Sequence, residues 1–147
     1  MTTISKSTAN PLRLLAIAAL MANLSPIARA ADWPSFKAGN WTFERTMSGM
    51  GRMPSKVSHT ECTDPASDQA SQRAMLEKSG CALTPLTQSG STYRYSATCT
   101  MAGMRTTSDS VLEVLSDESY TIRVDAIVDG DKTHEVLQAR RLGDCPR

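Results

Sequence analysis

The chain has 147 residues, about the length of one domain. Its 16 lysine and arginine residues nearly balance its 15 aspartate and glutamate residues, so the formal net charge is +1. A nearly neutral chain is poorly suited to binding nucleic-acid phosphates, and we exclude nucleic acid as a partner.

Residues 1–30 have the pattern of a secretion signal. Basic residues precede an apolar run over Leu14–Leu24, and Ala28 and Ala30 are small residues at the positions that a signal peptidase reads. The run is shorter than the roughly 20 apolar residues that cross a bilayer. We therefore expect cleavage after Ala30, a periplasmic location, and one mainly β domain over residues 31–147 without a transmembrane segment.

After an irregular start, the domain predicts two strands. Apolar and polar side chains alternate over residues 40–47, which is typical of a strand, and residues 56–62 form a second one. A helix is expected next, near 65–79, because Pro65 suits its first position and Gly80 suits its end. Along this helix Ala66, Ala70 and Ala74 fall on one side.

Five further strands are predicted after the helix. The strongest signals are the regular alternation in the sixth strand of the domain and the Asp-Gly turn that follows it. The five cover residues 81–88, 92–101, 105–115, 120–128 and 134–141. The sequence therefore predicts a mainly β fold, α+β by strict count. It consists of a single curved antiparallel sheet, or partly closed barrel, of about seven strands with one helix.

Four cysteines in an exported domain are typical of two disulfides. Their wide spacing, without a C-x-x-C motif, disfavours a zinc site. A hairpin that turns near residue 90 places Cys81 opposite Cys99, where the two side chains can bond. We therefore pair Cys81 with Cys99, which leaves Cys62 with Cys145.

The second pair predicts how the helix connects the strands. In strict up-and-down order Cys62 and Cys145 would lie at opposite ends of the sheet, roughly 20 Å apart, which no disulfide spans. A helix of about fifteen residues is roughly 22 Å long and can carry the chain back across the sheet. We therefore expect a crossover helix, with the strands before and after it running in the same direction.

The same crossover brings two methionine-containing loops to one end of the sheet. The first loop holds Met47, Met50 and Met53, and the second holds Met101 and Met104. Thioether sulfur is a soft ligand that selects Cu(I), so these residues are candidate metal ligands, and His59 or His134 could add an imidazole. Alternatively, Met47 and Met101 are core residues at strand ends, and the others pack loosely over the open end.

An apolar interior is the second candidate site, because a curved sheet can enclose a ligand. The candidate lining residues are Trp41, Phe43, Tyr93, Tyr95 and Tyr120. The alternative is that these side chains fill the core themselves.

No motif for catalysis is present: the chain lacks G-x-S-x-G, H-E-x-x-H and a glycine-rich phosphate loop. We therefore expect neither catalytic residues nor a cofactor, and we interpret the chain as a non-catalytic periplasmic binding or envelope-associated protein. Cu(I) binding through the methionine loops and transport of a small apolar ligand are the alternatives. If the partner is an envelope protein, we expect an exposed apolar patch or a free sheet edge.

Five segments carry a family resemblance: Gly39–Glu44, Met47–Pro54, Glu61–Pro65, Ser79–Cys81 and Ala139–Cys145. Together they resemble the exported bacterial family known as domain of unknown function 3617. The four-cysteine layout and the A-R-R-L-G-D-C ending are the most specific parts. The resemblance implies a signal-bearing periplasmic protein, but it implies no activity and carries over no functional residues.

Overall fold

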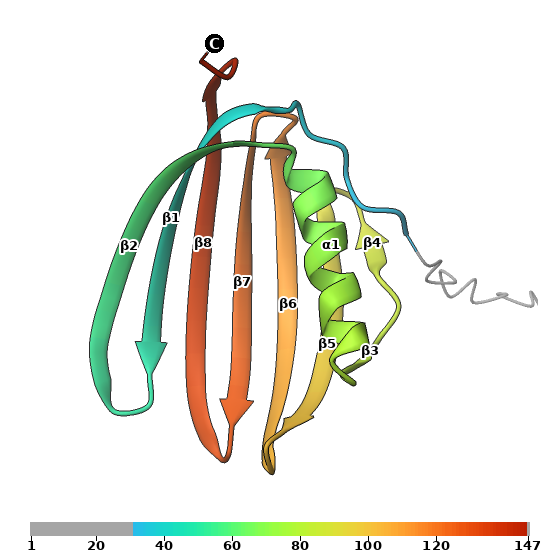
Figure 1. The fold of residues 1–147 in the computed structure, drawn as a ribbon, viewed down its shortest axis with the longest axis vertical. Coiled ribbons are helices and arrows are strands. Elements are labelled where there is room, and N and C mark those ends of the chain that lie inside the picture. Colours follow the sequence, from blue (N-terminus) through green and yellow to red (C-terminus); the bar gives the residue numbers. More distant parts are fainter. Residues whose placement is uncertain (1–30, 147) are drawn as a thin grey trace, which may run out of the picture.

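The computed structural model describes residues 31–146 as one open antiparallel sheet with a helix against it (Figure 1). The predicted secretion signal, residues 1–30, lies outside the described residues. The elements are β1 (Gly39–Gly49), β2 (Arg52–Thr63), α1 (Pro65–Lys78), β3 (Ala82–Leu83), β4 (Thr87–Ser89), β5 (Thr92–Met101), β6 (Met104–Ser116), β7 (Ser119–Val128) and β8 (Asp131–Gly143). The strand order is β2-β1-β8-β7-β6-β5-β3, and β4 also pairs with β5. The predicted mainly β fold class is confirmed, and the sheet is not closed into a barrel.

The sheet has eight strands rather than about seven because the strand predicted over 81–88 is divided in two. Pro85 lies between β3 and β4, and a proline has no amide hydrogen to continue the hydrogen-bond ladder. Leu86 follows it and is buried in the core.

Helix α1 begins where its cap predicts. The Asp64 carboxylate accepts a 3.1 Å hydrogen bond from the amide of Ala66, and Pro65 is the first helical residue. The helix ends at Lys78, one residue before the expected end, and Gly80 follows with a φ of +83°. The antiparallel pairings, traced from β2 across the sheet to β3, show that these two strands run in the same direction. The helix is therefore the predicted crossover.

Two disulfides hold the ends of the segment that contains α1. Cys62 is bonded to Cys145 with a Cα–Cα distance of 5.6 Å, and Cys81 to Cys99 with 4.3 Å. These are the pairings expected from the sequence. The first crosses over β1, because Asn40 pairs with Cys62 on one side and with Gly143 on the other. One bridge therefore lies just before the helix and the other just after it.

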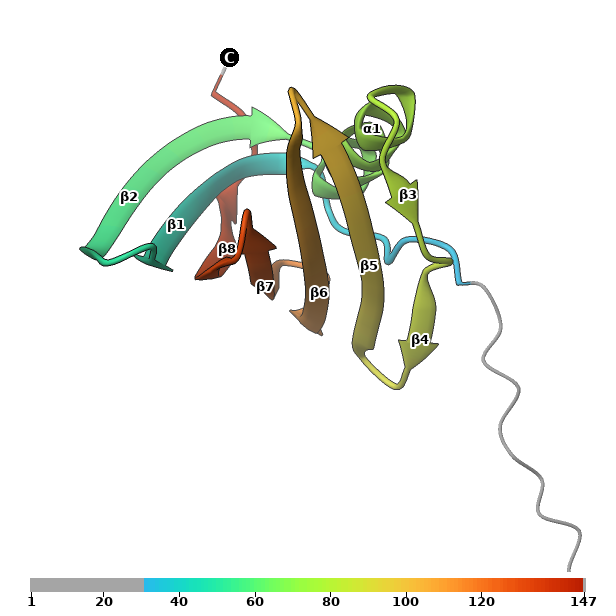
Figure 2. The same cartoon turned by 90° about the horizontal axis from the view of Figure 1, so that it is seen from below.

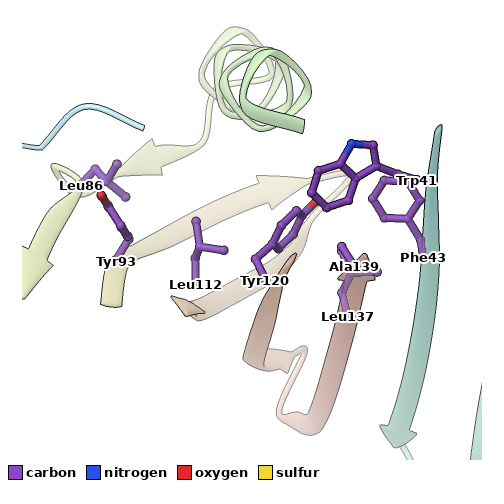
Figure 3. Close-up of a cluster of buried hydrophobic side chains, with 8 residues drawn as sticks. All are labelled: Trp41, Phe43, Leu86, Tyr93, Leu112, Tyr120, Leu137 and Ala139. Carbon is purple, nitrogen blue, oxygen red and sulfur yellow. The ribbon is translucent and has the colours of Figure 1, made fainter. Parts of the chain in front are cut away.

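The core lies on the face of the sheet that α1 covers, as Figure 2 shows for the curved sheet and Figure 3 for the side chains. Its buried members are Trp41, Phe43, Leu86, Tyr93, Leu112, Tyr120, Leu137 and Ala139. The rings of Trp41 and Tyr120 are 5.7 Å apart, and Phe36 from the segment before β1 lies 4.7 Å from Tyr120. The irregular start of the domain thus packs against the core with Trp33 and Phe36.

The opposite face of the sheet carries polar and charged side chains, as expected for an antiparallel sheet with one solvated face. Glu44 forms an ion pair with Lys56 at 3.0 Å, and Glu113 forms one with Arg123 at 3.2 Å. These side chains lie on the far side from Phe43 and Leu112, since successive residues of a strand alternate between the two faces.

The two edges of the sheet differ in length. Strand β2 pairs only with β1, and residues 52–62 are all exposed. At the other edge β3 has two residues and β4 has three. Within β2, Pro54 lacks an amide hydrogen and Lys56 adds a charge, and both features discourage further strand pairing.

Candidate functional site

Helix α1 faces the sheet with polar side chains. Gln69 and Arg73 are half-buried, whereas Ala70 and Ala74 are exposed, so the alanine side noted in the sequence is not the inner side. The Gln69 side chain hydrogen-bonds the hydroxyl of Tyr120. Polar contacts with side chains of the sheet therefore hold the body of the helix in place.

A groove, here called the α1 groove, lies between this helix and strands β1, β2, β7 and β8, with a volume of about 280 Å³. Its lining consists of Phe43, Arg45, His59, Glu61, Thr63, Asp68, Gln69, Gln72, Tyr120 and Leu137. The rings of Phe43 and His59 are stacked, with centres 5.0 Å apart and planes at 17°. Aromatic surfaces of the sheet thus lie opposite the amide side chains of the helix.

The polar groups of the α1 groove include two carboxylates, which only accept hydrogen bonds. The Asp68 carboxylate accepts a hydrogen bond from the Thr63 hydroxyl, and a Glu61 carboxylate oxygen lies 3.4 Å from Nε2 of His59. Arg45 also lines the groove, and its guanidinium forms a 3.2 Å ion pair with Glu135, which lies outside the lining. The groove is therefore suited to a ligand that donates hydrogen bonds or carries a positive charge.

Both burial and these carboxylates shift the pKa of the Tyr120 phenol. Burial raises the pKa of Tyr120 to about 12, the hydrogen bond with Gln69 acts against this, and the negative charges of Asp68 and Glu61 raise it further. The phenol therefore stays neutral at ordinary pH.

A second hollow, here called the hairpin pocket, lies at the turn between β1 and β2 and has a volume of about 390 Å³. Its lining consists of Met47, Ser48, Gly49, Met50, Arg52, Met53, Ser55, Thr133, His134 and Glu135. The three methionines of the first predicted loop therefore border one space, and His134 borders it as well. The other imidazole candidate, His59, lies in the α1 groove.

The two methionines of the second loop lie elsewhere at the same end of the sheet. Met101 and Met104 belong to the hairpin of β5 and β6. Strands β8 and β7 separate β1 from β6, so three strand spacings, roughly 14 Å, lie between the two groups. The structure thus gathers three of the five candidate sulfurs.

The residues expected to line an apolar interior lie mostly within the core. Trp41, Phe43, Tyr93 and Tyr120 are buried there, and Tyr95 packs against them half-buried. The rings of Trp41, Phe43 and Tyr120 lie next to one another in Figure 3, whereas Tyr93 lies beside Leu86. Only Phe43 and Tyr120 also border the α1 groove.

The sequence reasoning missed the contribution of the helix to this groove. The sequence indicated no role for Asp68, Gln69 or Gln72, which belong to a helix with almost no apolar side. The signal that could have found them is the spacing of Pro65, Gln69 and Arg73, which places all three on one side of the helix.

Between residues 31 and 146, no group of three or more histidine, cysteine, aspartate or glutamate side chains is placed to hold a metal ion. No helix in this part of the chain is long and apolar enough to cross a membrane.

The comparison with known families confirms the resemblance seen in the sequence. The model of the family described as "Protein of unknown function (DUF3617)" matches residues 36–145. This segment contains all eight strands, the helix and the four cysteines. No curated protein and no solved structure matches the chain. Because the match spans 110 of the 147 residues, the chain belongs to the family of proteins of unknown function DUF3617.

Proposed function

We propose that this protein is a non-catalytic binding protein of the periplasm that holds a small organic ligand in the α1 groove. The observation that carries the proposal is the composition of this groove. The rings of Phe43 and Tyr120 and the carboxylates of Glu61 and Asp68 border the same space of about 280 Å³. Ligand sites typically combine such an apolar surface with a few polar groups that fix orientation.

The lining indicates the chemistry of the ligand. The rings of Phe43 and Tyr120 are buried at the base of the groove and favour an apolar group there, whereas carboxylate oxygens only accept hydrogen bonds. The amides of Gln69 and Gln72 supply both donors and acceptors from the helix. The ligand would therefore present an apolar part together with N–H groups, such as those of an amine.

Two further observations support export. Helix α1, which covers the groove, has one disulfide just before it and one just after it. Disulfides persist in oxidising compartments such as the periplasm. The amide of Ala31, the first residue after the expected cleavage site, donates a 2.8 Å hydrogen bond to the carbonyl of Leu86. A chain that begins at Ala31 can keep this contact through its amino group.

The groove is tested by filling it. Gln72 is exposed on α1 and lines the groove, so Gln72→Trp should occupy the space without disturbing the core. Ala74 is exposed on the same helix outside the groove, and Ala74→Trp is the matched control. We expect native mass spectrometry of protein purified from the periplasm to show a small molecule on the wild-type and Ala74→Trp proteins but not on Gln72→Trp. Equal retention by both variants, or no retained molecule on the wild-type protein, would contradict the proposal.

Export is tested separately by expressing the full chain in a bacterium and fractionating the cells. We expect the intact mass of the periplasmic protein to correspond to residues 31–147 with two disulfides. Recovery of the uncleaved chain in the cytoplasmic fraction alone would contradict export.

A further inference from the structure

Three methionines of the β1–β2 hairpin border one space and remain partly exposed. Met47, Met50 and Met53 all border the hairpin pocket, and they are 40%, 45% and 90% exposed. Apolar side chains gain stability when they leave water, and none of these three is buried in the core. Their side chains can therefore reach a ligand in the pocket.

The turn of this hairpin does not itself call for methionine. Met50 and Gly51 both have positive φ angles, +53° and +64°, as in the type I′ turn that joins two strands through two residues. Such a turn prefers asparagine or aspartate followed by glycine, and the β7–β8 hairpin has Asp129 at the equivalent position with a φ of +51°. Met50 therefore adopts a backbone conformation that its side chain disfavours, and its presence needs a reason other than the turn.

Strand β2 contributes the third methionine of the pocket. Met47 pairs with Ser55, and Met53 lies two residues from Ser55, so the alternation of the strand places Met53 on the same face as Met47. A bulge follows toward the turn, where Gly49 pairs with Arg52. Met53 lines the pocket together with Met47.

Close approach of the turn to β8 completes the enclosure. A Cβ atom on Gly49 would lie 2.2 Å from the carbonyl oxygen of Lys132, so only glycine fits there. The amide of Met50 donates a 3.3 Å hydrogen bond to the same carbonyl. The hairpin is thus fixed over β8, and Thr133 and Glu135 form the far wall of the pocket.

From this arrangement we propose that the hairpin pocket binds one Cu(I) ion through the thioether sulfurs of Met47, Met50 and Met53. Thioethers are soft ligands that select Cu(I) over the harder divalent ions. All four cysteines are in disulfides, so no thiolate competes for the ion. This site is separate from the α1 groove, and neither proposal depends on the other.

The site is tested first with Ag(I). This ion shares the preference of Cu(I) for soft ligands and needs no reductant that would open the disulfides. Methionine methyl groups are labelled with ¹³C in the disulfide-intact protein, and their signals are followed by NMR during the titration. We expect the signals of Met47, Met50 and Met53 to shift together and to saturate at one equivalent of Ag(I). Zn(II) should shift none of them.

Three other methionines provide an internal control, because they are also exposed but lie outside the pocket. Met75, Met101 and Met104 are 62%, 54% and 53% exposed. We expect their methyl signals to stay in place up to one equivalent of Ag(I). Parallel shifts at all six exposed methionines, without saturation, would show adventitious binding and overturn the proposal.

One substitution tests the role of the Met50 sulfur while it preserves the turn. Met50→Asn removes a ligand and gives the type I′ turn a preferred residue, so the fold should be kept. Ala102→Asn makes the same change in the β5–β6 turn, where φ is +50°, and is the matched control. We expect Met50→Asn to weaken Ag(I) and Cu(I) binding by roughly tenfold or more, because changes around metal ligands already have effects of this size. Ala102→Asn should leave the binding unchanged. Wild-type affinity in a folded Met50→Asn protein would exclude the site.

Discussion

The guanidinium carbon of Arg73 lies 5.3 Å from the centre of the Tyr95 ring, and its Nη2 donates a 2.7 Å hydrogen bond to the carbonyl of Thr84. One side chain of α1 thus contacts both β5 and the loop between β3 and β4. We expect Arg73→Ala to lower the free energy of unfolding by about 1–2 kcal/mol, through loss of the cation–π contact and the hydrogen bond. Urea unfolding measures the change. Lys78→Ala, in the exposed last turn of the helix, is the control and should change stability by less than about 0.5 kcal/mol.

Trp41 is the centre of the core. It is fully buried, and its Nε1 donates a 3.0 Å hydrogen bond to the carbonyl of Lys37. Trp41→Phe should cost about 2–3 kcal/mol, because it leaves a cavity and an unpaired carbonyl. Trp33 is only half-buried, at the margin of the core beside Tyr95, so Trp33→Phe should cost less than about 1 kcal/mol. Equal losses in thermal or urea unfolding would contradict this account of the core.

The two disulfides should differ in their contribution to stability. Cys62 and Cys145 are 83 residues apart in the sequence, whereas Cys81 and Cys99 are 18 apart. Loop-closure entropy predicts about 4.5 kcal/mol for the longer loop and about 3 kcal/mol for the shorter one. Replacing each pair by two serines and comparing urea midpoints tests the order. A greater loss on removing the Cys81–Cys99 bridge would show that its local packing outweighs chain entropy.

Tyr120 should make the protein less stable at high pH. The phenol has a pKa of about 12 in the folded chain and about 10 in the unfolded chain. Between these values the folded protein binds more protons than the unfolded chain, so the free energy of unfolding falls as pH rises. The contribution is complete below pH 10 and is lost through about pH 12, by roughly 2–3 kcal/mol.

The difference between the wild-type protein and Tyr120→Phe isolates this effect, because the other titrating groups are common to both. We expect the unfolding free energy of the wild-type protein minus that of Tyr120→Phe, measured in urea at several pH values, to fall by roughly 2–3 kcal/mol from pH 10 to pH 12. Tyr93→Phe serves as the control, since Tyr93 lies in the same core but does not border the α1 groove. A constant difference for Tyr120→Phe would show that the buried phenol does not drive the pH dependence.

Features that depend on near neighbours in the sequence could be predicted almost to the residue. Pro65 and Gly80 placed the helix, because the start and the end of a helix depend on local interactions. The hairpin around residue 90 placed Cys81 opposite Cys99, and the observed pairing of Ala82 with Thr98 has the same symmetry. Pairing Cys62 with Cys145 then predicted the crossover, because these two cysteines meet at one end of the sheet only if the helix runs back across it.

Features that depend on distant contacts could not be predicted in this way. Trp33 and Phe36 lie in a segment without a regular pattern, and only the folded sheet shows that they cover the core. Likewise, Gln69 belongs to a helix with almost no apolar side, so its role follows from the position of Tyr120 beneath it. The α1 groove therefore arises from the path of the helix across the sheet rather than from a local motif.

The unequal edges of the sheet have a consequence for how copies of this chain can associate. A filament built by adding sheets side by side needs a long open strand on both sides of each molecule. Here only β2 is long, whereas the other side ends in strands of two and three residues. Association through β2 would use the same strand of both molecules and leave no further long strand to extend from. We therefore expect that strand pairing cannot join more than two chains, and Pro54 and Lys56 disfavour even that contact.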